Sequence, residues 1–164
     1  MRRRDLLGLA ATLPALAGAA PATRGEVVAW PEVTLLNGSH FGPAQAAGQA
    51  AVVVFWSITC PYCRRHNPRI EQLHRASSGR ALKVLGVAIE ADAEGVRRHA
   101  QERGYTFPIT LDHAALAAVL STRRLVPLTV TVDRQGRLRH VIPGEMSEPD
   151  VLELLQLAQK ENRT

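Results

Sequence analysis

The chain has 164 residues, of which 46% are hydrophobic and 21% are charged. This length and composition predict one globular domain with a buried core, and they leave too little chain for two domains of ordinary size. The formal net charge is +5, and the basic residues form no Lys/Arg stripe. The sequence therefore gives no basis for binding nucleic acid.

The first residues differ in character from the rest of the chain. Three arginines at positions 2–4 precede an uncharged stretch rich in Leu and Ala, which closes on Ala20-Pro21-Ala22. A basic start, an apolar middle and a small-residue end are typical of a signal for export. We predict a signal peptide over residues 1–22 and a single domain over residues 23–164.

The export route and the fate of this segment are two separate questions. The pair Arg3-Arg4 followed by Leu6 and Leu7 fits a twin-arginine signal, and general secretion is the alternative. An uncleaved anchor is the less favoured reading because the apolar stretch is short and contains Pro14. Membrane association is expected only if the signal stays uncleaved. Either route predicts a periplasmic protein, in a compartment where disulfides persist.

Apolar runs alternate with helical patterns along the rest of the chain. The run before the cysteines is continuously apolar and is expected to be buried on both faces. Alternating strands and helices predict a sheet with a parallel core, and the turn at residues 133–136 adds an antiparallel last strand. In chain order we expect a strand at 33–36, a strand at 51–56, a helix at 61–77 with Pro68 inside it, a strand at 82–89, a helix at 93–103 capped by Asp92, a strand at 107–111, a helix at 114–120 capped by Asp112, strands at 128–132 and 137–142, and a final helix capped by residues 147–150.

The only two cysteines, Cys60 and Cys63, directly follow the central apolar strand and stand at the start of a helix. This position exposes the first thiol and covers the second, which is what reversible disulfide exchange requires. A Cys-x-x-Cys pair also occurs in zinc sites, but we predict a redox-active disulfide between Cys60 and Cys63, with no cofactor and no metal.

The helix start favours the thiolate of Cys60, because backbone N–H groups and the positive end of the helix dipole point at its sulfur. Arg64, Arg65 and His66 are expected to add positive charge. We predict that Cys60 is the nucleophile and that Cys63 resolves the mixed disulfide. His66 lies three residues after Cys63 on the same helical face, so it is a candidate proton acceptor; a solvated surface histidine is the other reading.

The order strand, Cys-x-x-Cys, helix, strand, helix, then Val126-Pro127 before a hairpin and a closing helix resembles the thioredoxin superfamily. The stretch from Trp30 to Trp56 and the added elements between residues 89 and 125 resemble its TlpA-like branch of exported thiol-disulfide oxidoreductases. The resemblance implies an α/β protein with a thioredoxin fold: a central mixed sheet flanked by helices, an extra N-terminal strand and turn, and an inserted βα element.

The resemblance also implies roles for individual residues. Pro127 becomes the cis-proline of the superfamily, and Val126 and Pro127 shape substrate binding together with Pro61 and Tyr62. Two positions depart from the pattern. Val54 stands where thioredoxin has a buried Asp, and His66 stands where TlpA-like proteins often carry a Glu, so the usual proton acceptor for the buried thiol is missing.

TlpA-like proteins generally act as reductants in an oxidising compartment. The resemblance therefore implies reduction of disulfides in periplasmic client proteins, for example in cytochrome c maturation, with electrons drawn from a membrane transporter of the DsbD or CcdA type. Two alternatives stay open. One is a disulfide-forming oxidase, and the other is a Sco-like copper carrier with Cys60, Cys63 and His66 as ligands.

Overall fold

The structure is a computed structural model that describes residues 20–159. The predicted signal peptide, residues 1–22, therefore lies outside the described residues except for its last three. Of these, Ala22 donates its backbone N–H to the carbonyl of Val119 (2.9 Å). Within residues 20–159, no helix is both long and apolar enough to cross a membrane.

The central sheet has five strands in the order β5-β4-β3-β6-β7. The three strands β3, β4 and β5 run parallel, and β6 and β7 are antiparallel additions at the other side. The predicted mixed sheet is confirmed, and the parallel core is confined to three strands. The strands are β3 Ala50–Trp56, β4 Leu82–Ala88, β5 Ile109–Thr110, β6 Leu128–Val132 and β7 Leu138–Pro143.

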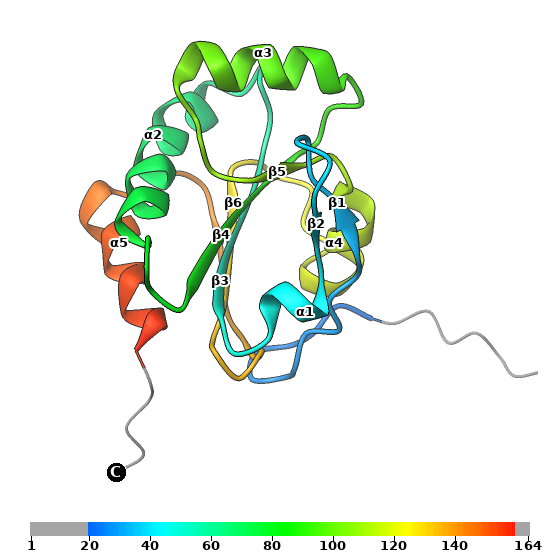
Figure 1. The fold of residues 1–164 in the computed structure, drawn as a ribbon, viewed down its shortest axis with the longest axis vertical. Helices are drawn as coiled ribbons and strands as arrows, with labels where there is room; N and C mark the ends of the chain where they lie inside the picture. Colours follow the sequence, from blue (N-terminus) through cyan, green and yellow to red (C-terminus); the bar gives the residue numbers. More distant parts are fainter. Residues whose placement is uncertain (1–19, 160–164) are drawn as a thin grey trace, which may run out of the picture.

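Helices cover both faces of this sheet. Figure 1 views the sheet close to edge-on, with α2 and α5 on one side and α1 and α4 on the other. The connections that carry the chain between the parallel strands run through α2 and α3. The helices are α1 Pro43–Ala46, α2 Pro61–Ala76, α3 Ala93–Arg103, α4 His113–Leu120, α5 Glu148–Glu153 and the 3-10 helix η1 Leu154–Ala158.

The N-terminal addition is a small antiparallel pair, β1 Val33–Thr34 and β2 His40–Phe41, joined through a turn at Gly38. Gly38 has φ +85°, a left-handed conformation that favours glycine. The predicted extra strand and turn are confirmed, as is the inserted βα element, β5 with α4. The sequence did not predict β2 or α1, because elements of two and four residues show no periodicity.

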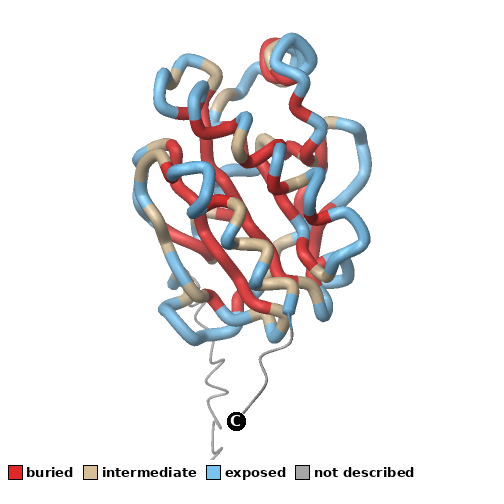
Figure 2. The backbone as a smooth tube through the Cα atoms, turned by 90° about the vertical axis from the view of Figure 1, so that its left-hand side faces the viewer, coloured by how far each residue is buried: buried red, intermediate tan, exposed pale blue. Residues whose placement is uncertain are grey.

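The core has two parts, one on each face of the sheet. All seven residues of β3 are buried, as predicted, and Figure 2 shows the strands as the buried interior of the molecule. Along β6 the alternation is strict: Leu128, Val130 and Val132 belong to the core on the α4 side, whereas Thr129 and Thr131 point to the opposite face. Val54 of β3 belongs to the core on the α2 side, together with Cys63.

Four predicted elements differ in detail. The strand predicted at 33–36 is only Val33–Thr34 in the structure. The strand predicted at 107–111 is only Ile109–Thr110 in the structure. Asp112 precedes α4, but its carboxylate accepts the N–H of Thr34 (2.8 Å), so it fixes the N-terminal addition and makes no cap hydrogen bond. The final helix begins as predicted, with Ser147 accepting the N–H of Asp150, but it tightens into the 3-10 helix η1 after Glu153.

Candidate active site

The dithiol lies where β3 ends and α2 begins. Cys60 is the N-cap of α2, and its sulfur accepts the backbone N–H of Cys63 with 3.2 Å between N and S. The turn between strand and helix is closed by the carbonyl of Ser57, which accepts the N–H of Cys60 (3.4 Å). Both cysteines are free thiols. The helix start therefore directs a backbone donor at Cys60, as the sequence predicted.

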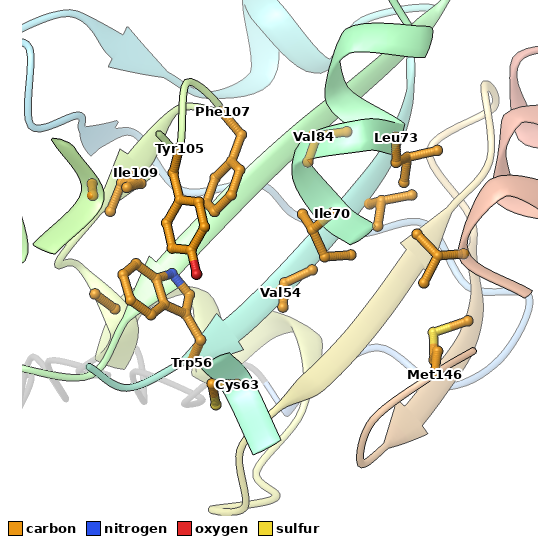
Figure 3. Packing of buried hydrophobic residues seen from close by; sticks show 14 of the residues in the cluster. Val54, Trp56, Cys63, Ile70, Leu73, Val84, Tyr105, Phe107, Ile109 and Met146 are labelled. Carbon is orange, nitrogen blue, oxygen red and sulfur yellow. The ribbon is translucent and has the colours of Figure 1, made fainter. Parts of the chain in front are cut away.

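The two thiols differ in their environment. Cys60 is half-buried, whereas Cys63 is 1% exposed and packs beside Trp56 in the core on the α2 side (Figure 3). Burial raises the pKa of Cys63 to about 12, and the hydrogen bond with Cys60 and the negative charge of Glu90 add to the shift. Cys63 is therefore a thiol at neutral pH and has to lose its proton before it can act as a nucleophile.

A second segment, distant in sequence, completes the site at Cys60. The peptide bond between Val126 and Pro127 is cis, as the resemblance implied. The thiol of Cys60 donates to the carbonyl of Val126 with 3.6 Å between S and O. The carbonyl of Pro127 accepts the N–H of Gly144 (2.8 Å), which ties this segment to the end of β7. Val126 thus lies directly beside the half-buried thiol of Cys60, and Pro127 follows it in the chain.

His66 is fully buried, so its interpretation as a solvated surface histidine is wrong. The backbone N–H of Met146 donates to Nδ1 (3.3 Å), and Nε2 lies 3.2 Å from the hydroxyl of Thr129. Since Nδ1 accepts, the neutral ring carries its proton on Nε2 and donates it to Thr129. Burial lowers the pKa of His66 to about 4, with Arg69 adding to the shift. His66 is neutral at pH 7 and has no free lone pair to offer Cys63.

The positive charge near the dithiol is smaller than the sequence suggested. His66 contributes none, because it is neutral. Arg65 forms an ion pair with Glu145 (2.9 Å) and its guanidinium lies over the ring of Tyr62, 4.8 Å from the centroid. Glu145 also binds Arg69 (2.8 Å). The carboxylate of Glu145 therefore offsets much of the charge that α2 brings to this end of the molecule.

One carboxylate close to the dithiol was missed by the sequence analysis. Glu90 follows β4, and its Oε1 accepts the N–H of Ile58 (2.8 Å) in the turn that leads to Cys60. Its Oε2 is buried and has no hydrogen-bond partner. A signal for this residue exists in the sequence: parallel strands end at the same edge of a sheet, so the residue after β4 lies close to the residues after β3.

Among the described residues, 20–159, no three His, Cys, Asp or Glu side chains are grouped so that they could hold a metal ion. The trio considered for copper, Cys60, Cys63 and His66, includes a ring whose two nitrogens are both hydrogen-bonded within the protein.

Comparison with known proteins agrees with the fold and with thiol-disulfide oxidoreductase activity. A family model described as Redoxin matches residues 19–156. The thiol-disulfide oxidoreductase ResA of Geobacillus kaustophilus is 26% identical over 121 residues, covering 73% of this chain and 68% of ResA. The soluble secreted antigen MPT53 of Mycobacterium bovis is 30% identical over 74 residues, covering 45% of this chain and 42% of the antigen.

Among solved structures, a thioredoxin family thiol:disulfide interchange protein from Chlorobium tepidum superposes with a TM-score of 0.74 at 21% identity. The superposition covers 83% of this chain and 97% of that protein, and it supports the same fold. The chain belongs to the Redoxin family and is a TlpA-like thiol-disulfide oxidoreductase of the thioredoxin superfamily.

Proposed function

We propose that the protein is exported and reduces disulfides of client proteins in the periplasm, for example those formed by the haem-binding thiols of cytochrome c. The observation that carries the proposal is the unequal exposure of two thiols held at one helix start. Cys60 is accessible beside the cis Val126–Pro127 bond, and Cys63 is 1% exposed. This arrangement suits a thiol that attacks a protein disulfide and a second thiol that waits until the mixed disulfide has formed.

The reaction follows from the two positions. The thiolate of Cys60 attacks one sulfur of the client disulfide, an S–S bond forms between Cys60 and the client, and the other client sulfur leaves as a thiolate. Cys63 then loses its proton and attacks the sulfur of Cys60. The Cys60–Cys63 disulfide forms, and the second client sulfur leaves with its electron pair. The client gains two electrons and the dithiol is oxidised.

The charges around the site favour a reductant over the alternative oxidase. Extra positive charge beside the first cysteine would stabilise the reduced, thiolate-bearing form and make the couple oxidising. His66 is neutral, and Arg65 is paired with Glu145. Two of the three positive charges that the sequence suggested for Cys60 are therefore absent or offset, which supports a couple that gives up electrons.

Exposed apolar side chains supply a surface for the client chain. Tyr62 lies between the two cysteines and is 58% exposed, and Leu125 precedes Val126 and is 42% exposed. A groove next to the cis-proline is lined by Ile89, Leu125 and Val126 together with one side of α4. Pro61, Tyr62, Val126 and Pro127 are proposed to contact an extended client segment, whose backbone would align with the edge at Val126.

Export and the electron source complete the proposal. The chain begins with a sequence typical of a signal peptide, proposed to span residues 1–22 and to precede the domain 23–164, and one similar protein is described as a secreted antigen. A reductant in an oxidising compartment has to be reduced again after each turnover. A membrane thiol transporter of the DsbD or CcdA type is proposed to supply the two electrons.

The experiment uses the reduced protein and a synthetic peptide that carries a Cys-x-x-Cys-His disulfide. The expected result is one peptide disulfide reduced per dithiol oxidised. Cys63→Ser is expected to trap a covalent adduct between the protein and the peptide, because the resolving thiol is absent. Cys60→Ser is expected to form no adduct. An adduct of equal yield with Cys60→Ser would refute the assignment of Cys60 as the nucleophile.

A further inference from the structure

The buried thiol of Cys63 needs a proton acceptor, and none of the expected groups provides one. Val54 occupies the position on the central strand where thioredoxin has a buried Asp, and this side chain is 1% exposed in an apolar core. His66, three residues after Cys63, accepts from Met146 and donates to Thr129, so both of its ring nitrogens are engaged. Burial is the largest cause of the raised pKa of Cys63, and it persists when Cys60 is held in a mixed disulfide, so the thiol of Cys63 resolves that disulfide slowly at neutral pH without such an acceptor.

Glu90 is fixed against the turn that carries the dithiol. Its Oε1 accepts the N–H of Ile58 (2.8 Å), two residues before Cys60. The next residue back, Ile89, donates its N–H to the carbonyl of Trp56 (3.1 Å), which ties the end of β4 to the end of β3. With one carboxylate oxygen bound to the backbone, the side chain is held in one position and the other oxygen is left for a different partner.

The free oxygen of Glu90 belongs to an unusual set. Four buried side-chain atoms of the described residues have no hydrogen-bond partner, and three of these are Trp56 Nε1, Glu90 Oε2 and Tyr105 Oη. Trp56 packs beside Cys63, and Figure 3 shows the hydroxyl of Tyr105 directed at the nitrogen-bearing edge of the Trp56 indole. Trp56 and Tyr105 belong to the same core cluster as Cys63. Buried polar atoms are almost always paired, so the unpaired oxygen of Glu90 is available to accept a proton.

The carboxylate also acts on Cys63 electrostatically. Its negative charge is among the causes that raise the pKa of the thiol, after burial and the hydrogen bond with Cys60. Two other titratable side chains are on this side: Tyr105, whose pKa is raised by burial, and His99 on α3, which Arg103, Glu102, Arg64 and Glu90 also influence. Burial lowers the pKa of His99, so it is a weaker proton acceptor than an ordinary histidine.

We propose that Glu90 is the proton acceptor for Cys63 during resolution of the mixed disulfide, in the role that the sequence suggested for His66. The inference rests on the proposed roles of Cys60 and Cys63. In this step the proton of Cys63 passes to Glu90 and then to water, the sulfur of Cys63 bonds to the sulfur of Cys60, and the client sulfur leaves with the electron pair of the broken bond.

In the test, reduced protein is mixed with one equivalent of 5,5′-dithiobis(2-nitrobenzoate), and the release of thionitrobenzoate is followed by stopped-flow absorbance. The attack of Cys60 releases one thionitrobenzoate in a first phase, and the attack of Cys63 releases the second one in a second phase. With Glu90 as acceptor, the wild-type second phase is expected to have a rate independent of pH between about pH 6 and 8, because the thiol of Cys63 stays protonated over that range and gives its proton to a group of the protein.

Glu90→Gln keeps an oxygen for Ile58 and removes the base. Its second phase is expected to be about 100-fold slower than wild type at pH 7, and to lose a further tenfold per pH unit on acidification, since only pre-formed thiolate reacts. The first phase is expected to be unchanged. The matched control His99→Gln removes the neighbouring titratable group and is expected to keep the pH-independent second phase.

Two results would overturn the proposal. One is a Glu90→Gln second phase within twofold of wild type across the pH range. The other needs no variant: a wild-type second phase that itself falls tenfold per pH unit. Failure of the underlying function has a different signature, because the first phase would then persist in Cys60→Ser.

Discussion

The buried, neutral His66 makes a direct prediction about stability against pH. In the unfolded chain a histidine has its ordinary pKa of 6.5, and in the folded protein burial lowers the pKa of His66 to about 4. Below pH 6.5 the unfolded state binds the proton and the folded state does not. The stability that depends on the neutral ring is therefore complete above pH 6.5 and is lost as the pH falls from about 6.5 to about 4.

The size of the effect follows from the difference between the two pKa values. Each unit corresponds to about 1.4 kcal/mol, so a difference of about 2.5 units is worth about 3 kcal/mol once the pH reaches 4. At pH 5 about 2 kcal/mol is already lost. The ring is fully buried, so little solvent screening reduces these values.

The assay is urea unfolding of wild type and His66→Gln at pH 7 and pH 5. His74, His99 and His140 also have lowered pKa values, but they are present in both proteins and cancel in the comparison. The variant is expected to lose about 2 kcal/mol less than wild type between the two pH values. The control His40→Gln, at an exposed position, is expected to follow wild type. Equal losses in wild type and His66→Gln would refute the account of a neutral, buried His66.

Two further substitutions test the support of the site and its client surface. Glu71 on α2 accepts the N–H groups of Thr106 (2.7 Å) and Phe107 (3.2 Å). Glu71→Ala is therefore expected to lower the free energy of unfolding by about 3 kcal/mol, measured by urea unfolding. A loss below about 1 kcal/mol would contradict this role of Glu71. Leu125→Ala is expected to lower kcat/KM for the peptide disulfide about fivefold and to leave the reaction with 5,5′-dithiobis(2-nitrobenzoate) unchanged. Val27 is another exposed apolar residue, so Val27→Ala serves as the control. Equal effects on both substrates would remove Leu125 from the client surface.

The long elements of the fold could be predicted because each carries a continuous pattern with clear ends. The apolar run of β3 ends at Trp56 as expected, and α3 begins after Asp92 and ends at Gly104, which has φ +68°. Asp112 shows why a local rule can fail. Its spacing before α4 fits a cap, but a distant backbone donor, Thr34, takes its carboxylate. A contact across 78 residues leaves no trace in the local sequence.

The site residues also fall into those that the sequence predicts and those that it does not. Cys60, Cys63 and the cis bond before Pro127 follow from a short motif and a resemblance, and the structure brings them together. Helical spacing correctly put His66 on the face of Cys63, but spacing does not tell whether that face is buried. Glu90 was missed because its contact with the dithiol turn joins residues 32 positions apart and depends on how parallel strands align.

The reduction potential of the Cys60–Cys63 pair tests the central claim most directly, by equilibration of the domain in graded thiol-disulfide buffers with Trp fluorescence or thiol trapping as the readout. A reductant with little uncompensated positive charge at Cys60 is expected to have a potential below about −240 mV. A potential above about −150 mV would contradict the account and identify the protein as an oxidase.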